Sequence, residues 1–188
     1  MARIPYPDPA KLPAEARDLL ESLPQLNIFR MIAGSGASFL PFMAFINSYL
    51  NAGVLEPELR ELVILRVGHL CKSNYELHQH RRVSRMIGMS EERIAASAGA
   101  LPSPLFSEVE NAALLFTDDQ VAHVKADGKL FADAHEYLGD TGMQELVIVI
   151  GTYLLVCRYL ETFEIDLEER DIETSGLDEI RRGLDRHG

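Results

Sequence analysis

Three side chains near the middle of the sequence have the types and spacing that acid-base chemistry needs. Glu76 and His80 are four residues apart, so on a helix they lie about 40° and one turn apart and can touch. A carboxylate beside an imidazole stabilises the protonated ring, raises its pKa and fixes its orientation, as a general acid near neutral pH requires. Glu61 lies on the preceding predicted helix, and it reaches the same point if the two helices form a hairpin.

Structural roles compete with the catalytic interpretation at each position. Residues 73–76 (SNYE) have the pattern of a capping box, in which the serine and the glutamate would satisfy backbone N–H groups at a helix start. Glu61 could form an ordinary ion pair with an arginine such as Arg66. A lone histidine in the place of His80 would more often be a satisfied polar residue than a catalyst. Both interpretations stay open.

A metal site is a further alternative, because glutamates and histidines are common ligands. His78 and His80 are two residues apart, hence about 200° around a helix, and cannot both face one ion. The glutamate-x-x-histidine repeat of di-iron bundles is absent from the sequence, as are a glycine-rich phosphate loop and a serine nucleophile elbow. We therefore expect neither a metal nor another cofactor.

Helices must position these groups, because apolar residues recur at helical spacing and no segment alternates like a strand. Ser107 with Glu110, and Thr141 with Gln144, repeat the capping-box pattern. The last helix is so apolar through its middle that we expect it to be buried nearly all round, with an oligomer interface sharing in covering it. We predict an all-α protein with helices over residues 13–23, 27–32, 38–51, 57–71, 73–88 and 142–164, and others starting near 90 and 107.

The size and charge of the chain narrow its class. Its 188 residues, 47% of them hydrophobic, are enough to fill one core, so we expect a single domain over residues 1–188 with an extended arm at 1–12 and a polar tail at 167–188. The formal charge of -11 repels phosphate backbones and anionic lipid surfaces. We therefore expect no nucleic-acid partner and no membrane partner.

The sequence also predicts a cytoplasmic location. The first residues lack the continuous apolar stretch of a signal peptide. The apolar stretch at residues 146–157 is shorter than the roughly 20 residues that span a bilayer. Cys71 and Cys157 lie far apart in sequence, which favours reduced thiols over a disulfide framework.

The spacing of Glu61, residues 73–76 and His80 resembles that of a sequence motif in the alkylhydroperoxidase D-like branch of the carboxymuconolactone decarboxylase superfamily. Members of that branch carry a glutamate, eleven residues, a cysteine, two residues, a second cysteine, three residues and a histidine. This chain has the same spacing, and the segments RELVILRV, IGMSEERI and YLLVCRYLETFEI are also similar, so the likeness spans about residues 3–165. It implies the orthogonal helical bundle of that superfamily and a homo-oligomer of two, three or six subunits. The matching positions here are Glu61, Ser73, Glu76 and His80.

Both cysteines of the motif are replaced in this chain, by Ser73 and Glu76. The dithiol peroxidase chemistry of the branch needs a nucleophilic thiolate and a resolving thiol one helical turn away. We do not expect Cys71 and Cys157 to form that pair, and Cys71 falls near a helix C-terminus, where the dipole disfavours a thiolate. The resemblance therefore supports the fold of the branch more strongly than it supports peroxidase activity.

The decarboxylase branch implies cofactor-independent acid-base chemistry on a small carboxylated organic molecule. Loss of carbon dioxide from a substrate with its own electron sink requires only a proton donor and a place for the carboxylate. Two alternatives remain, a peroxidase-related redox protein and a non-catalytic helical oligomer or binding module. The residues assigned to the leading mechanism are His80 as proton donor, Glu76 as its orienting partner, Glu61 as a second acid-base or positioning group, and Tyr75 as hydrogen-bond donor to the developing oxyanion.

Overall fold

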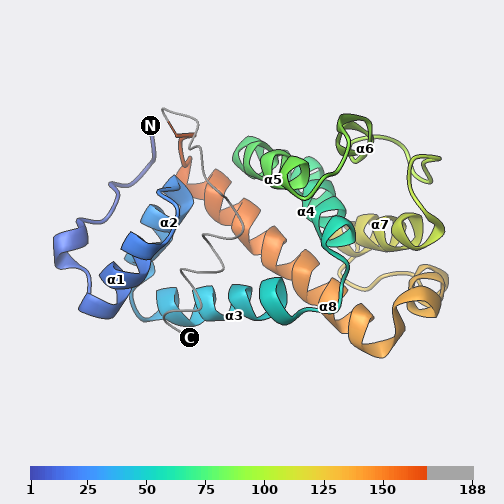
Figure 1. Ribbon diagram of the computed structural model, residues 1–188, viewed down its shortest axis with the longest axis horizontal. Coiled ribbons are helices and arrows are strands. Elements are labelled where there is room, and N and C mark those ends of the chain that lie inside the picture. The colour runs from blue at the N-terminus through green and yellow to red at the C-terminus, as the bar shows by residue number, and fades with distance from the viewer. Residues whose placement is uncertain (169–188) are drawn as a thin grey trace. The chain divides into compact units, whose positions relative to one another are not determined.

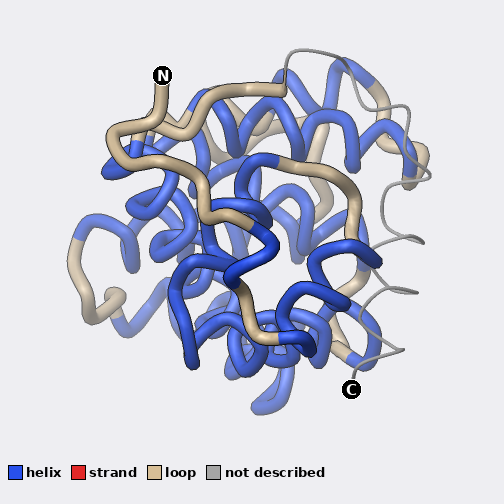
Figure 2. Tube along the Cα trace, turned by 90° about the vertical axis from the view of Figure 1, so that its left-hand side faces the viewer, coloured by secondary structure: helices blue, strands red, loops and turns tan. Residues whose placement is uncertain are grey.

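The computed structural model describes residues 1–168, and in them every regular element is helical. Figure 1 labels the α-helices, and the tube in Figure 2 shows helices joined by loops. The predicted all-α class is confirmed, whereas most of the predicted polar tail lies outside the described residues. The elements are 3-10 turns Pro9–Lys11 (η1) and Ala33–Ser38 (η2), and α-helices Ala14–Ser22 (α1), Asn27–Ile32 (α2), Phe39–Ala52 (α3), Pro57–Cys71 (α4), Asn74–Met86 (α5), Glu91–Ala96 (α6), Glu108–Ala122 (α7) and Gly128–Phe163 (α8).

The contacts within the chain group it into two compact units. The terminal unit consists of residues 1–53 together with the chain from residue 160 onward, and the central unit consists of residues 54–159. All the candidate site residues fall in the central unit. The expectation of one domain over the whole chain remains a prediction.

In the terminal unit, the N-terminal arm is bound to the end of α8. The amide of Arg3 donates to the carbonyl of Phe163 (2.9 Å), and the amide of Ala2 donates to the Asp166 carboxylate (3.0 Å). The arm is not extended throughout, because Asp8 accepts a hydrogen bond from the amide of Ala10 and starts the turn η1.

In the central unit, α4 is buried along most of its length and turns back into α5. The turn is made by Lys72, which adopts the left-handed conformation (φ 56°, ψ 34°) and donates to the carbonyl of His69. The two helices approach closely at Gly68, where an added Cβ would lie 3.1 Å from Cδ2 of Leu77. The hairpin that the sequence analysis required between Glu61 and His80 is therefore present.

The helix α8 differs from its prediction in two ways. Its helical run includes a break at Gly139 (φ 64°, ψ -176°), so the final segment begins before residue 142, and the side chain of Gln144 donates to the carbonyl of Asp140. Within the single chain it is also not buried all round, whereas the prediction counted an oligomer interface among the surfaces that cover it. Leu146 and Ile150 are buried, but Ile148 and Leu155 are 41% and 48% exposed. Both faces of α8 consist of apolar residues, but the rest of the chain covers only one of them.

Two helical stretches are long and apolar enough to cross a bilayer by length and composition alone, Asn27–Ala52 and Gly128–Phe163. Core helices of soluble proteins meet the same criterion, and each stretch is interrupted by a non-helical glycine, Gly36 in the first and Gly139 in the second. These stretches are therefore weak evidence for membrane spans.

Candidate active site

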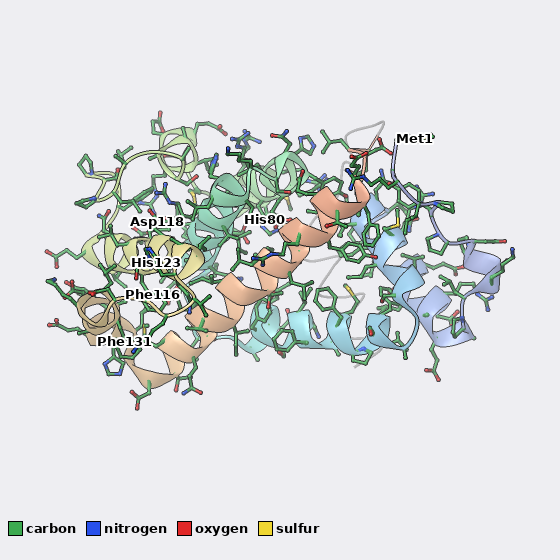
Figure 3. The ribbon with its side chains drawn as sticks, turned by 180° about the vertical axis from the view of Figure 1, so that it is seen from behind. Met1, His80, Phe116, Asp118, His123 and Phe131 are labelled. Atoms are coloured by element: carbon green, nitrogen blue, oxygen red, sulfur yellow. The ribbon has the colours of Figure 1, made fainter. Side chains whose placement is uncertain are left out.

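The central unit brings together the three charged groups that the sequence analysis selected. Nδ1 of His80 lies 2.8 Å from Oε2 of Glu61, and Nε2 lies 3.0 Å from Oε1 of Glu76. Figure 3 labels His80 among the helices of this unit. Glu61 is 1% exposed and Glu76 is 4% exposed, so both carboxylates are removed from bulk water. The predicted convergence of one imidazole and two carboxylates is confirmed.

The two contacts of the ring differ in geometry. The contact with Glu61 is a well-aligned hydrogen bond, whereas Oε1 of Glu76 lies at ion-pair distance without a well-aligned hydrogen bond. We therefore treat the Glu76 contact as an ion pair. The better alignment and deeper burial make Glu61 the carboxylate that fixes the ring.

The charges around His80 keep its ring protonated. Burial alone lowers the pKa of the imidazole, but the negative charges of Glu61 and Glu76, together with the hydrogen bond to Glu61, outweigh burial and raise the pKa to about 10. At neutral pH the ring is therefore an imidazolium, and both of its nitrogens carry protons. Nδ1 donates to Glu61, and Nε2 faces Glu76.

The aromatic side chain that lies against His80 comes from α8. The Tyr153 ring meets the imidazole edge to face, with ring centroids 5.0 Å apart, and this tyrosine is 6% exposed. The sequence analysis missed Tyr153, although a tyrosine within the apolar stretch at residues 146–157 was a usable signal. Tyr75, the aromatic residue that it selected, is buried on α5 next to Glu76.

The capping-box interpretation of residues 73–76 is wrong. Ser73 occupies the N-cap position of α5, but its side chain makes no capping hydrogen bond, and Glu76 is paired with His80 instead. The same pattern at Ser107 and Glu110 does form a capping box, with both reciprocal hydrogen bonds. The alternative ion pair of Glu61 with Arg66 is also wrong, because Arg66 binds Asp118.

Arg66 connects the buried part of α4 to its surroundings. Its Nε and Nη2 each lie 2.5 Å from an oxygen of Asp118 on α7, and Nη1 donates to the carbonyls of Ser97 and Gly99. The guanidinium is thus satisfied on several sides while being only 9% exposed. These bonds fix α4, which carries Glu61.

Cys71 and Cys157 lie outside the cysteine positions of the motif, and the expectation that they do not form the dithiol pair of the branch remains a prediction. The Cys71 side chain, burial and the charge of Glu76 raise the pKa of the Cys157 thiol. Both cysteines are free, with Cys157 buried and Cys71 partly exposed.

The described residues contain no grouping of three or more His, Cys, Asp or Glu side chains suited to a metal ion. In the nearest candidate set, both ring nitrogens of His80 are paired with the carboxylates of Glu61 and Glu76. The set can hold and transfer a proton.

A model of the carboxymuconolactone decarboxylase family matches residues 39–119, which include Glu61, Glu76 and His80. No curated protein matches the chain significantly. The family match therefore covers the whole α4–α5 hairpin, while α8 with Tyr153 and Cys157 lies outside it.

Several solved structures have the same fold. An uncharacterized peroxidase-related protein from Ralstonia eutropha with an alkylhydroperoxidase AhpD core gives a TM-score of 0.75 at 21% identity, over 89% of this chain and 93% of that one. A protein of unknown function from Agrobacterium tumefaciens, proposed to be the antioxidant defence protein AhpD, gives 0.66 at 24% identity, over 71% and 92%. The debrominase Bmp8 gives 0.68 at 14% identity, over 97% and 96%.

Sequence identities this low show only that the fold is the same. The family match, in contrast, covers the region of the sequence motif. Residues 39–119 therefore match the carboxymuconolactone decarboxylase family, the chain has the same fold as the AhpD-like structures, and it lacks the pair of cysteines at the motif positions.

Proposed function

We propose that this protein is an enzyme that carries out cofactor-independent acid-base chemistry, decarboxylation or a related reaction, on a small carboxylated organic molecule. The observation that supports the proposal is the His80 imidazolium held between two buried carboxylates. Perturbed ionisable groups that converge in this way are typical of catalytic sites. The match of residues 39–119 to the decarboxylase family agrees with the reaction class.

In this mechanism the proton leaves from Nε2 of His80. Nδ1 is held by the aligned bond to Glu61, whereas Nε2 faces the less well aligned carboxylate of Glu76. Because the pKa of the ring is about 10, His80 is always loaded with a proton at neutral pH and can still protonate a much more basic enolate carbon. Glu61 positions the ring.

The roles of the two glutamates are therefore exchanged relative to the sequence-based hypothesis. Glu76 is the acid-base partner beside Nε2, and it either moves aside for the substrate or relays the proton. Its Oε1 is buried without a well-aligned hydrogen bond, so a substrate hydroxyl or carboxylic acid could donate to it. Tyr75 keeps its proposed role as donor to the developing oxyanion, and Tyr153 packs against the ring.

The test is release of carbon dioxide from a panel of small β-keto acids and carboxylated lactones. The unmodified protein should turn over at least one of them, and His80→Asn should reduce kcat by at least about 100-fold, the lower range for a general acid. The matched control is His78→Asn, an exposed histidine two residues away on the same helix. Equal turnover by His80→Asn would remove His80 from the mechanism. No turnover of any substrate would favour the non-catalytic alternative.

A peroxidase-related function is the second candidate, favoured by the likeness of the fold to a peroxidase-related AhpD-like protein and by the presence of two free cysteines. Replacing both cysteines by serine should leave decarboxylation intact and abolish any peroxide reduction. The two functions are thereby distinguished with one variant. The debrominase Bmp8 has been solved with 2,3,4-tribromopyrrole, which indicates that this fold can accept small aromatic ligands as well.

We also propose a homo-oligomer and a cytoplasmic location, without nucleic-acid or membrane partners. The exposed apolar side of α8, formed by Val147, Ile148 and Leu155, is the surface that we assign to a second copy of this chain. Ile148→Glu should lower the mass measured by sedimentation to that of a smaller species. An unchanged mass would exclude this surface as the interface.

A further inference from the structure

Two buried polar atoms at the start of α5 have no hydrogen-bond partner among the described residues. The Ser73 side chain is fully buried, and its hydroxyl makes no capping bond to α5 and no bond to another group. Glu76 is 4% exposed, and its Oε1 lies near Nε2 of His80 without an aligned hydrogen bond. A buried polar atom without a partner is costly, so folded proteins rarely keep one without a reason. These two atoms are suited to pair with each other in a second arrangement.

The two side chains lie within reach of one another. Ser73 is the N-cap residue of α5 and Glu76 follows three residues later, so both lie on one side of the first turn. They also adjoin the same residue of α4. The Ser73 amide donates to the carbonyl of Gly68 over 3.0 Å, and a Cβ added at Gly68 would lie 3.6 Å from Cγ of Glu76. Rotation of the Glu76 side chain can therefore bring its carboxylate to the Ser73 hydroxyl.

The start of α7 has the paired arrangement in the same protein. Ser107 and Glu110 have the same spacing, and there the serine hydroxyl donates to Oε2 of the glutamate (2.9 Å) and accepts from its amide (3.4 Å). The Ser107 amide also donates to that oxygen. The Ser73 amide is already bonded to Gly68, so its hydroxyl is the group that remains for Glu76. The first turn of α5 thus contains the side chains of a capping box that is open.

The contact that holds the box open is the weaker of the two at the imidazole. Glu61 forms the aligned bond to His80 (2.8 Å), whereas Glu76 lies at ion-pair distance. If Glu76 leaves, Glu61 still compensates the charge of the ring. The departing carboxylate moves toward the N-terminus of a 13-residue helix, where the helix dipole and the Ser73 hydroxyl both stabilise a negative charge. The movement therefore exchanges one stabilising environment for another, and it uncovers Nε2 of His80.

We propose that Ser73 is a positioning residue that acts through Glu76. The carboxylate contacts His80 in the resting protein, and the Ser73 hydroxyl receives it when it leaves Nε2 free for a substrate. In this second position Oγ of Ser73 donates to the Glu76 carboxylate and accepts from the Glu76 amide, as Ser107 does with Glu110. The use of the free Nε2 rests on the function proposed above, whereas the two positions of Glu76 do not depend on it.

The test removes the imidazolium, which should move Glu76 to Ser73 without any substrate. In the unmodified protein, Ser73→Ala should leave the equilibrium constant of unfolding nearly unchanged. In the His80→Asn background the same substitution should raise that constant about fivefold, the size of a lost N-cap. Ser107→Ala is the matched control, and it should raise the constant by the same factor in both backgrounds. Urea unfolding of the full-length protein at pH 7 gives these constants.

Hydrogen exchange of the Glu76 amide reports the same movement directly, because a capping bond slows the exchange of the amide that donates it. The Glu76 amide should exchange more slowly in His80→Asn than in the unmodified protein, and adding Ser73→Ala should cancel that change. The Glu110 amide is the internal reference, since its capping bond is present throughout. If His80→Asn does not fold, Glu61→Gln/His80→Asn serves as the background, because it retains the charge of Glu76 and removes that of Glu61.

Either of two results would overturn the proposal. One is an effect of Ser73→Ala on unfolding that is the same with and without His80, and the other is an exchange rate of the Glu76 amide that does not change when His80 is replaced. Each would mean that Glu76 has no second position at Ser73. Release of carbon dioxide is not part of either readout, so a failure of the proposed function leaves this test valid, and a failure here leaves the assay of His80→Asn unaffected.

Discussion

His80 donates a hydrogen bond from Nδ1 to Oε2 of Glu61 over 2.8 Å, and this bond joins two helices across nineteen residues of sequence. Because Glu61 is almost fully buried, its charge is compensated inside the protein, and the imidazolium is the compensating group. The same bond orients the ring so that Nε2 faces Glu76. One interaction thus contributes to both the helix hairpin and the proposed chemistry.

The first prediction concerns the coupling between these two residues. His80→Asn leaves two buried carboxylates without their cation and should lower the free energy of unfolding by about 3 to 5 kcal/mol at pH 7. The double variant Glu61→Gln/His80→Asn should recover part of that loss, because the uncompensated charge is removed. Denaturant unfolding of the two single variants and the double variant gives the coupling energy. Strict additivity of the two losses would show that the pair is not energetically linked.

The second prediction is a pH dependence. The pKa of His80 is about 10 in the folded protein and near 6.5 in the unfolded chain. A folded-state pKa above the unfolded one means that the folded state binds the extra proton, so the stabilisation is complete below pH 6.5 and decreases as pH rises toward 10. The difference in unfolding free energy between the unmodified protein and His80→Asn should shrink over that range. A difference that stays constant from pH 6.5 to 10 would contradict the raised pKa.

The sequence was sufficient to predict the helical class, the α4–α5 hairpin and the pairing of Glu76 with His80. Each of these depends on local spacing, since a four-residue separation on a helix fixes a contact whatever the rest of the fold does. Glu61 was placed correctly because the turn between the two helices is short. The family resemblance supported the same three residues.

Contacts contributed by α8 could not be predicted in this way. Tyr153 reaches the site from more than seventy residues further along the chain than His80, and helical periodicity does not specify which turn of α8 faces α5. Similarly, the apolar character of α8 indicated burial all round, although one side of it is exposed. Tertiary packing, rather than local pattern, determines both.

The third prediction tests the contacts that Arg66 makes with Asp118 and with two backbone carbonyls. Lysine keeps the charge but lacks the planar fork that binds both oxygens of Asp118 and two backbone carbonyls. Arg66→Lys should therefore lower the free energy of unfolding by about 2 kcal/mol or more. Arg85→Lys is the matched control, since Arg85 forms a similar two-point contact with Glu91 on the exposed surface and should lose less than about 1 kcal/mol. Equal losses would show that burial does not strengthen the Arg66 contacts.

The fourth prediction distinguishes two serines that have the same sequence pattern. Ser107 accepts a hydrogen bond from the amide of Glu110 and caps α7, so Ser107→Ala should lower the free energy of unfolding by about 1 kcal/mol. Ser73 makes no capping bond, and its buried hydroxyl has no hydrogen-bond partner among the described residues. Ser73→Ala should therefore leave the free energy of unfolding nearly unchanged. Urea unfolding of both variants gives the comparison. A capping-sized loss for Ser73→Ala would restore the capping interpretation of residues 73–76.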